Sequence, residues 1–228
     1  MTSRRILSLS GGFNFRDLGG YPTIGQSTVK WHKLVRSGYL TDLVDEDLKK
    51  LIDYGIDIVI DLRSESEVIS YPDRLSEEIE YIKLPIFSQD QTESNISLEK
   101  IYQLYAKNSD GGFQKIMRSY RKLAIDRHAQ RAYRHFFEIL LKYGNKKGIL
   151  FHCSAGKDRT GMCALLLLAA LGVRMEDIRK DYMLTNVASV VRVEWRISEA
   201  KKMQLGSNFI SSVRDLATVR NEYFDQLI

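Results

Sequence analysis

The chain has 228 residues, of which 44% are hydrophobic and 28% are charged. This composition excludes a disordered chain, a collagen-like chain and a long coiled coil. The formal net charge of +5 favours anionic partners. Charge alone does not separate nucleic acid from phosphate esters or membrane surfaces.

The chain carries two cysteines, which exclude a disulfide scaffold and indicate a reducing compartment. The N-terminal residues lack the apolar core of a signal peptide. The longest apolar run, residues 162–171, is shorter than the roughly 20 residues that cross a bilayer. We therefore expect a cytoplasmic protein without a transmembrane segment, with export by a non-classical route as the alternative.

The first half of the chain alternates short strands and helices. We expect a hairpin arm within residues 27–36 and a helix over 42–54 that stops at Gly55. The β-branched run 56–62 predicts an interior strand of a mostly parallel sheet. A second strand is expected over 81–87 and a helix over 97–106.

The second half is mainly helical. The pattern predicts a helix over 128–143, a buried strand over 148–153 and an enclosed apolar helix over 160–171. Further helices are expected over 175–189, over 190–203 and from residue 207 onward. Strands separated by helices indicate an α/β fold with a small, mostly parallel central sheet flanked by helices.

No repeat or break in composition divides the chain, so we expect one domain over residues 1–228. Residues 88–127 are polar and lack a clear place in the sheet. We expect them to form a helical lid, with Ile101, Leu104 and Tyr105 facing inward. A plain surface helix is the alternative.

Residues 148–161 have the pattern of a catalytic site. A buried strand is followed by a thiol, then by a short loop that contains glycine, and then by a helix. The loop amides of residues 154–158, placed at a helix N-terminus, stabilise a thiolate and a phosphate alike. Arg159 can grip two phosphate oxygens, and Thr160 can donate its hydroxyl to the departing sulfur. The expected phosphate-binding residues are Ser154, Ala155, Gly156, Lys157, Asp158, Arg159 and Thr160.

This order predicts that Cys153 attacks phosphorus and forms a cysteinyl-phosphate that water hydrolyses. The alternative is a buried structural cysteine. We expect that structural role for Cys163, which lies among apolar residues.

Several ordered motifs resemble the atypical bacterial protein-tyrosine and phosphoinositide phosphatases, which include secreted virulence phosphatases of some intracellular pathogens. The resemblance spans nearly the whole chain. The motifs are FNFRDLGGY at 13–21, LVRSGYL at 34–40, DLRSESEV at 61–68, HCSAGKDRTG at 152–161 and DYMLTN at 181–186.

The resemblance implies a cysteine-phosphatase-like fold, with Cys153 as nucleophile and Arg159 as the phosphate-binding arginine. It also implies that Lys157 and Asp158 support phosphoinositide dephosphorylation, with Asp158 as general acid. Neither a metal nor an organic cofactor is implied.

A second candidate for the general acid is Asp90. Some relatives have an aspartate shortly after a strand that contains Leu-Pro, and this chain has Ser88 at the corresponding position. Asp90 lies two residues further on. We prefer Asp158 and keep Asp90 as the alternative.

Further polar residues are candidates for supporting the loop. His152 is expected to be an orienting hydrogen-bond group, and Asp61 with Arg63 to brace the loop or to form an ordinary ion pair. Asn14, Arg16 and Asp17 either lie near the site or hold a turn through side-chain hydrogen bonds. The histidines lack metal-ligand spacing, so we expect no metal site.

We therefore expect a phosphatase for phosphotyrosine, with a range that extends to phosphoserine, phosphothreonine and phosphoinositides. Its partners would be phosphorylated proteins or phosphoinositides, with a phosphate or sulfate ion in the loop, and not nucleic acid. Two alternatives stay open. One is an inositol-phosphate or lipid phosphatase without a protein substrate, and the other is a non-catalytic phosphate-reading module.

Overall fold

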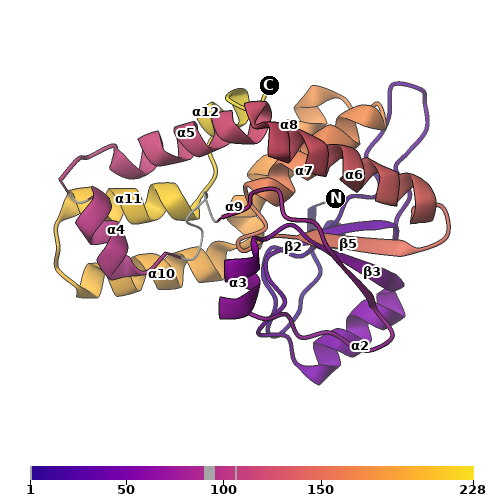
Figure 1. Ribbon diagram of the computed structural model, residues 1–228, viewed down its shortest axis with the longest axis horizontal. Coiled ribbons are helices and arrows are strands. Elements are labelled where there is room, and N and C mark those ends of the chain that lie inside the picture. Colours follow the sequence, from indigo (N-terminus) through magenta and orange to yellow (C-terminus); the bar gives the residue numbers. More distant parts are fainter. Residues whose placement is uncertain (1, 90–95, 106) are drawn as a thin grey trace.

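The computed structural model describes residues 2–89, 96–105 and 107–228 (Figure 1). Five strands and twelve helices occur in this part of the chain. The strands are β1 (Arg16–Asp17), β2 (Leu34–Ser37), β3 (Ile56–Asp61), β4 (Glu80–Lys83) and β5 (Gly148–His152). The helices are α1 (Thr2–Arg5), α2 (Asp45–Tyr54), α3 (Glu65–Ser70), α4 (Leu98–Tyr105), α5 (Gly111–Ile125), α6 (Arg127–Tyr143), α7 (Arg159–Ala170), α8 (Met175–Met183), α9 (Thr185–Ala188), α10 (Val190–Lys202), α11 (Ser207–Ala217) and α12 (Asn221–Asp225).

The strands form one sheet in the order β1-β2-β5-β3-β4. β5 is central and pairs in parallel with β2 and β3, so that Leu150 lies opposite both Val35 and Val59. β4 extends the parallel pairing at one edge, and β1 adds an antiparallel strand at the other. The predicted α/β fold with a mostly parallel central sheet is confirmed.

Helices cover both faces of this sheet. Val35, Val59 and Leu150 belong to a buried cluster that includes Leu48 and Leu51 of α2. The alternate residues of β3 and β5 belong to a larger cluster with α6 and α7. In Figure 1, α2 lies on one side of the strands, and α6 and α7 lie on the other. The sheet is therefore buried on both faces, as the β-branched runs indicate.

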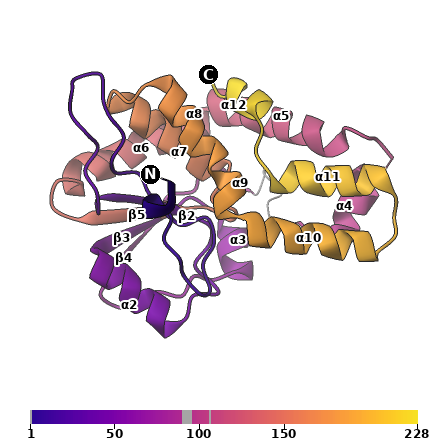
Figure 2. The same ribbon diagram turned by 180° about the vertical axis from the view of Figure 1, so that it is seen from behind.

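A second group of helices lies beyond one end of the sheet. There α4, α5, α10 and α11 run beside one another (Figures 1 and 2). Ile101 and Tyr105 face inward, as predicted, but Leu104 is 49% exposed, so its expected inward position is wrong. That this segment covers the site as a lid stays a prediction.

Several boundaries differ from those expected. The strand predicted over 81–87 ends at Lys83, just before the Leu84-Pro85 pair, because proline has no N–H for a strand ladder. The helix predicted over 175–189 divides at Leu184 into α8 and α9, and the final helix is interrupted at Thr218. Gly55 and Gly172 follow helices with φ of 94° and 77°, in the left-handed region that favours glycine.

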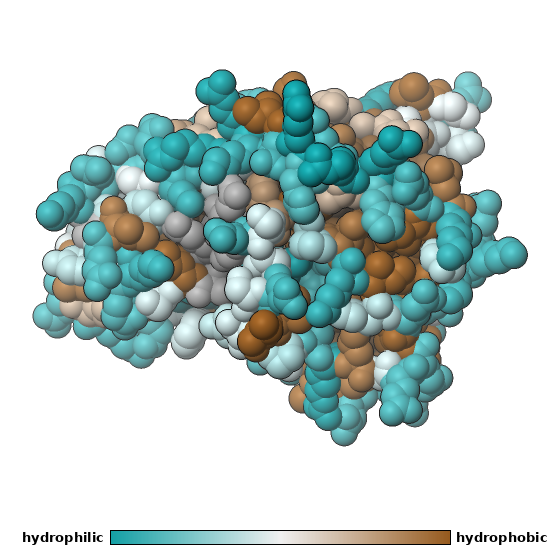
Figure 3. Space-filling model, in the orientation of Figure 1, coloured by the Kyte–Doolittle hydropathy of each residue, from teal (hydrophilic) through white to brown (hydrophobic). Residues whose placement is uncertain are grey.

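Hydrophilic side chains cover most of the face seen in Figure 3, and apolar atoms gather right of centre, over the sheet and α2. No helix in the described ranges is long and apolar enough to cross a membrane.

Gly148 opens the central strand and leads to a testable prediction for the fold. A Cβ at this position would lie 1.9 Å from the carbonyl oxygen of Gly55, whereas the nearest atom to a Cβ on Gly25 is 3.9 Å away. We expect Gly148→Ala to lower the free energy of unfolding by about 1–3 kcal/mol, the usual cost of overpacking. Gly25→Ala should stay within about 0.5 kcal/mol. Urea denaturation of both variants measures the difference, and equal stabilities would contradict the packing described here.

Candidate active site

The phosphate loop, residues 153–158, joins β5 to α7. Because β5 is central, the loop emerges from the carboxyl edge of the parallel strands, where α/β proteins bind ligands. The side chains of Cys153, Ser154, Arg159 and Thr160 are buried at this point. The loop also lies at the N-terminus of α7, whose dipole favours an anion.

Gly156 lets the loop pack against β2. Its φ is +65°, and a Cβ would lie 2.3 Å from the carbonyl oxygen of Ser37, so only glycine fits. The backbone N–H groups of Ser154, Ala155, Gly156 and Lys157 donate no hydrogen bond within the described part of the chain. These donors are therefore available to an anion.

Arg159 is held by a carboxylate that was not predicted from the sequence. Its Nη1 and Nη2 atoms each lie 2.6 Å from an oxygen of Glu67 on α3. The hydroxyl of Ser154 also donates to Glu67. Glu67 thereby connects both ends of the phosphate loop, and the planar pairing fixes the guanidinium in one orientation.

Local sequence explains why Glu67 stands in this position. Ser64 caps α3, and its backbone N–H and hydroxyl both donate to Glu67, at 3.0 and 2.7 Å. This capping box follows the end of β3 directly. The spacing of Ser64 and Glu67 was the available signal for a helix start, but it does not reveal the distant partner Arg159.

The same contacts keep Glu67 ionised. Burial alone would raise the pKa of its carboxyl, but hydrogen bonds from Arg159, Ser154 and Ser64 and the charge of Arg159 outweigh burial. They lower the pKa from 4.5 to about 2. Arg159 therefore faces a carboxylate anion throughout the physiological pH range.

Asp181 connects the outer side of the loop to the sheet. Its carboxylate lies 3.2 Å from Nε of Arg16 and 2.7 Å from Nη1 of Arg36. Arg36 in turn donates to the carbonyl oxygen of Gly156, at 2.9 Å. Burial opposes ionisation of Asp181, but the two arginines lower its pKa. Asp181 and Arg36 are further site residues that were not predicted from the sequence, although both fall within motifs of the resemblance.

The candidates of the N-terminal motif separate into two groups. Asn14 donates to the carbonyl oxygen of Ala155, at 2.9 Å, and Arg16 donates to Asn14 and to Thr185. Asp17 instead accepts from the backbone of Gly19 and of His32 and holds a turn. The structure therefore places Asn14 and Arg16 at the loop and Asp17 in the turn.

His152, Asp61 and Arg63 form a cluster beside the loop with Asp73, which was not among the predicted residues. His152 Nε2 lies 3.0 Å from Asp73, and Arg63 Nη2 lies 2.7 Å from both Asp61 and Asp73. Burial disfavours charged His152, but the two carboxylates outweigh burial and raise its pKa. The three potential metal ligands Asp61, Asp73 and His152 lie together, but the guanidinium of Arg63 already supplies the positive charge between the carboxylates.

Lys157 and Asp158 pair within the loop itself. Nζ of Lys157 lies 2.6 Å from Oδ1 of Asp158, and both side chains are buried. The ring of Tyr120 lies 6.0 Å from Nζ of Lys157, and its hydroxyl is 2.7 Å from that of Tyr182. Burial and the neighbouring Asp158 raise the pKa of Tyr120 well above its usual value, so the phenol keeps its proton.

Thr160, Cys163 and Asp90 are the remaining residues that the sequence analysis singled out. The buried hydroxyl of Thr160 has no hydrogen-bond partner among the described residues, which leaves it available to the sulfur. Cys163 is buried in the apolar cluster on α7, and burial raises the pKa of its thiol. Asp90 lies outside the described residues.

Comparisons with known proteins show the family of this chain. The sequence profile described as "Tyrosine phosphatase family" matches residues 7–228. A protein of Cupriavidus necator named as a tyrosine-protein phosphatase is 32% identical over 174 residues, which are 76% of this chain and 60% of the relative. The "Triple specificity protein phosphatase PtpB" of Mycobacterium tuberculosis is 31% identical over 211 residues, which are 85% of this chain and 74% of PtpB.

Solved structures give a weaker similarity. A variant of TpbA from P. aeruginosa, solved in complex with phosphotyrosine, has a TM-score of 0.33 at 12% identity. The match covers 98% of this chain and 93% of the TpbA chain.

The chain spans 60% of the length of the Cupriavidus relative. Because the family profile covers almost every residue from the N-terminal motif to the last helix, the chain belongs to the tyrosine phosphatase family.

Proposed function

We propose that the protein hydrolyses phosphotyrosine through a cysteinyl-phosphate intermediate. The observation that carries this proposal is the phosphate loop. Cys153 lies at the head of four available backbone donors, and Glu67 holds Arg159 rigidly at its end. Membership of the tyrosine phosphatase family supports the same reaction.

In the first step, the thiolate of Cys153 attacks phosphorus and the bond from phosphorus to the tyrosine oxygen breaks. The non-bridging oxygens gain negative charge as the phosphoryl group moves. The loop amides and the N–H groups of Arg159 stabilise that charge, because they are already oriented before the reaction begins.

The departing tyrosine oxygen takes a proton from a general acid. Asp158 is the preferred acid, since it lies in the loop next to Arg159. Its Oδ1 atom contacts Lys157, so Asp158 must first take up a proton before it can protonate the leaving oxygen. Asp90 remains the alternative. In the second step the same carboxylate accepts a proton from water, water attacks phosphorus, and the sulfur–phosphorus bond breaks. The products are inorganic phosphate and the thiolate, which Thr160 can stabilise by donating its hydroxyl.

A wider substrate range is part of the proposal. It includes phosphoserine and phosphothreonine. PtpB is named a triple specificity phosphatase, which supports a range wider than phosphotyrosine alone. Lys157 is paired with Asp158 within the loop, and its positive charge is in excess only when Asp158 holds the catalytic proton; in that state it favours multiply charged inositol head groups as well.

The alternatives differ in measurable ways. A lipid or inositol-phosphate phosphatase would leave phosphopeptides intact, and a phosphate-reading module would bind phosphate without turnover. A panel of phosphopeptide, nitrophenyl phosphate and soluble phosphoinositide separates all three. Location in the cytoplasm stays a prediction from the sequence, and export by a non-classical route stays its alternative.

Replacing the nucleophile tests the covalent mechanism. Cys153→Ser should abolish turnover, because a hydroxyl is a much weaker nucleophile at neutral pH. Binding of phosphate or tungstate should persist, since the loop amides and Arg159 remain. Cys163→Ser makes the same chemical change at the other cysteine and should keep turnover. Turnover by purified Cys153→Ser protein would exclude the cysteinyl-phosphate pathway.

Glu67→Gln tests the carboxylate that holds Arg159. Removing one partner of a buried ion pair costs about 3–5 kcal/mol, so this variant should unfold at lower urea concentration. The folded pKa of about 2 lies below the ordinary 4.5. The stabilising contribution is therefore complete above pH 4.5 and is lost as pH falls toward 2.

The difference in unfolding free energy between wild type and Glu67→Gln should thus be constant above pH 4.5 and shrink below it. The exposed Glu65, in the same helix, supplies the control Glu65→Gln, which should match wild type at every pH. We also expect kcat/KM to fall at least about tenfold in Glu67→Gln, which corresponds to about 1.4 kcal/mol of transition-state stabilisation. A difference that does not change with pH would contradict this role of Glu67.

Asp158→Asn tests the general acid through the leaving group. Tyrosine is a poor leaving group and needs protonation, whereas nitrophenolate leaves readily without it. The variant should lose much more kcat on a phosphotyrosine peptide than on nitrophenyl phosphate. Steady-state kinetics on both substrates measure this. If Asp158→Asn keeps its rate on phosphotyrosine while Asp90→Asn loses it, the acid is Asp90.

A further inference from the structure

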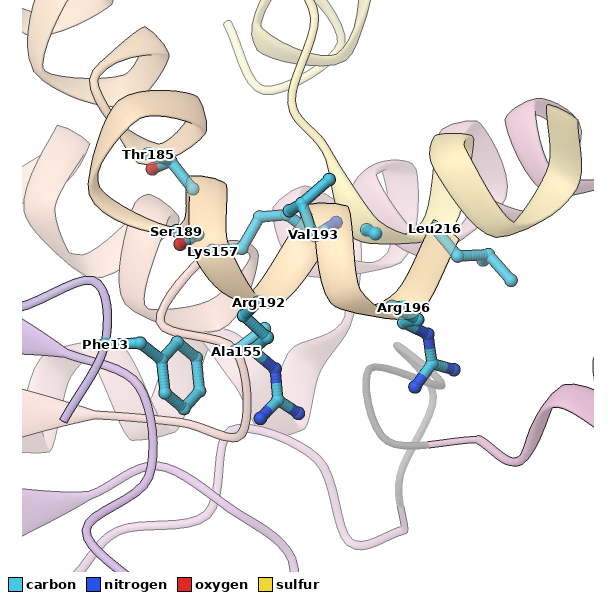
Figure 4. A pocket seen from close by; sticks show the side chains of 10 residues that line it. Phe13, Ala155, Lys157, Thr185, Ser189, Arg192, Val193, Arg196 and Leu216 are labelled. Carbon is cyan, nitrogen blue, oxygen red and sulfur yellow. The ribbon is translucent and has the colours of Figure 1, made fainter. Parts of the chain in front are cut away.

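A groove beside the phosphate loop contains two arginines of α10. Arg192 and Arg196 are one turn apart and extend from the same side of the helix, with Arg192 beside Phe13 and Ala155 (Figure 4). The two arginines border two hollows. A narrow one, shown in Figure 4, lies beside the loop and is also lined by Phe13, Ala155 and Ser189. A wider groove of about 380 Å³ shares only the two arginines with it. We call this wider groove the α10 groove, and its walls include Tyr39, Tyr71, Ser97, Arg192, Trp195 and Arg196.

Arg192 is fixed close to the loop. Its guanidinium lies 4.3 Å from the centre of the Phe13 ring and 5.0 Å from that of Tyr39. Nη1 donates to the Tyr39 hydroxyl, at 2.9 Å. Tyr39 itself is anchored to the loop, because its backbone N–H donates to the carbonyl oxygen of Ser154. The positive charge of Arg192 therefore stands immediately outside the site of the scissile phosphate.

Arg196 follows one turn later, and its charge is not balanced by a carboxylate in the described part of the chain. Its Nη2 donates to the carbonyl oxygen of Ile96. Burial lowers the pKa of Arg196 to about 10, and the positive charge of Arg192 is a second, smaller cause. The buried cations Arg16, Arg36 and Arg159 at the loop, in contrast, each pair with an acidic residue. An anion bound beside Arg196 would offset the repulsion that Arg196 experiences from Arg192.

A further donor lies at the N-terminus of α10, about one turn before Arg192. Ser189 lines the same hollow as Ala155 and Arg192. It is 6% exposed, and its hydroxyl has no hydrogen-bond partner among the described residues. Buried hydroxyls normally have a partner, so this one has unused capacity to donate to a ligand.

We propose that Arg192, Arg196 and Ser189 form a second anion subsite, which selects phosphopeptides that carry a second phosphorylated residue close to the hydrolysed phosphotyrosine. This proposal rests on the proposed function. Arginine suits the role because its planar N–H groups match the oxygens of a phosphate.

The walls of the groove favour a peptide over an inositol ring. The rings of Tyr39 and Tyr71 are stacked, with centroids 5.9 Å apart, and Trp195 is 63% exposed. Aromatic rings of this kind provide large apolar contact for the side chains of an extended peptide. The carboxylate of Glu199 also lines the groove, but it pairs with Lys202, at 2.6 Å.

The test uses two matched phosphotyrosine peptides and the full chain. In one peptide, a residue near the phosphotyrosine is replaced by phosphonomethyl-phenylalanine, a phosphotyrosine mimic that phosphatases do not hydrolyse. The matched peptide carries phenylalanine at the same position. The comparison is repeated for each position near the phosphotyrosine. We expect wild type to prefer the phosphonate peptide by about tenfold in kcat/KM at the best position, the value of one charge-assisted hydrogen bond. The preference should weaken at high salt.

Arg192→Gln and Arg196→Gln should each lower this preference toward equality, and Arg196→Lys should keep part of it. Arg134, an exposed residue of α6, supplies the control Arg134→Gln, which should keep both the preference and the rate on nitrophenyl phosphate. Thermal unfolding checks that each variant is folded. If Arg196→Gln does not fold, Arg196→Lys and Arg192→Gln decide the test.

Equal rates on the two peptides, or variants that keep the wild-type preference, would overturn the subsite while hydrolysis of phosphotyrosine stands. Failure of wild type to cleave either peptide would instead defeat the proposed function. In that case, calorimetric affinity for the two peptides, in wild type and in Arg196→Gln, still decides the subsite. If Arg196→Gln impairs a soluble inositol bisphosphate and not the phosphonate peptide, the assignment to peptides is wrong.

Discussion

The buried ion pair between Arg159 and Glu67 is the constraint on which the candidate site depends. It joins the helix that follows β3 to the helix that follows β5, two neighbouring strands of the sheet. Glu67 completes the capping box of α3, accepts from Ser154 and orients Arg159 with one carboxylate. Such a pair is expensive to desolvate and adds little net stability, so its value lies in a fixed geometry.

The other buried charges of the loop follow the same logic. Arg36 and Arg16 share Asp181, and Lys157 pairs with Asp158. Most positive charges around the loop are therefore balanced by a carboxylate, and the net charge there is small. Affinity for phosphate must come mainly from the backbone donors of the loop, the N-terminus of α7 and the guanidinium of Arg159. The overall charge of +5 is a poor guide to this site.

Prediction from sequence worked where the signal was local. The run 148–153, the loop and the apolar helix after it are consecutive in the chain, so this strand, loop and helix could be predicted from sequence alone. The roles of Cys153 and Arg159 stay predictions that rest on this order. Glu67 could not be predicted, because its partner is 92 residues away and a capping box explains the same serine and glutamate. Leu104 was misplaced for a related reason, since helical periodicity does not tell which of two adjacent faces the neighbouring helices cover. The α10 groove was not foreseen, because the side of α10 that carries Arg192 and Arg196 is defined only by packing.

The central claim is a covalent bond from phosphorus to the sulfur of Cys153. The most direct measurement is rapid acid quenching during turnover of a phosphotyrosine peptide, followed by proteolysis and mass spectrometry of the peptide that contains Cys153. We expect this peptide to gain the mass of one phosphoryl group, and we expect the group to be lost under conditions that cleave a phosphorus–sulfur ester bond. Its amount should rise when formation of the intermediate is faster than its hydrolysis. Hydrolysis that proceeds with no phosphoryl group on Cys153, or with the group on another residue, would contradict the central claim.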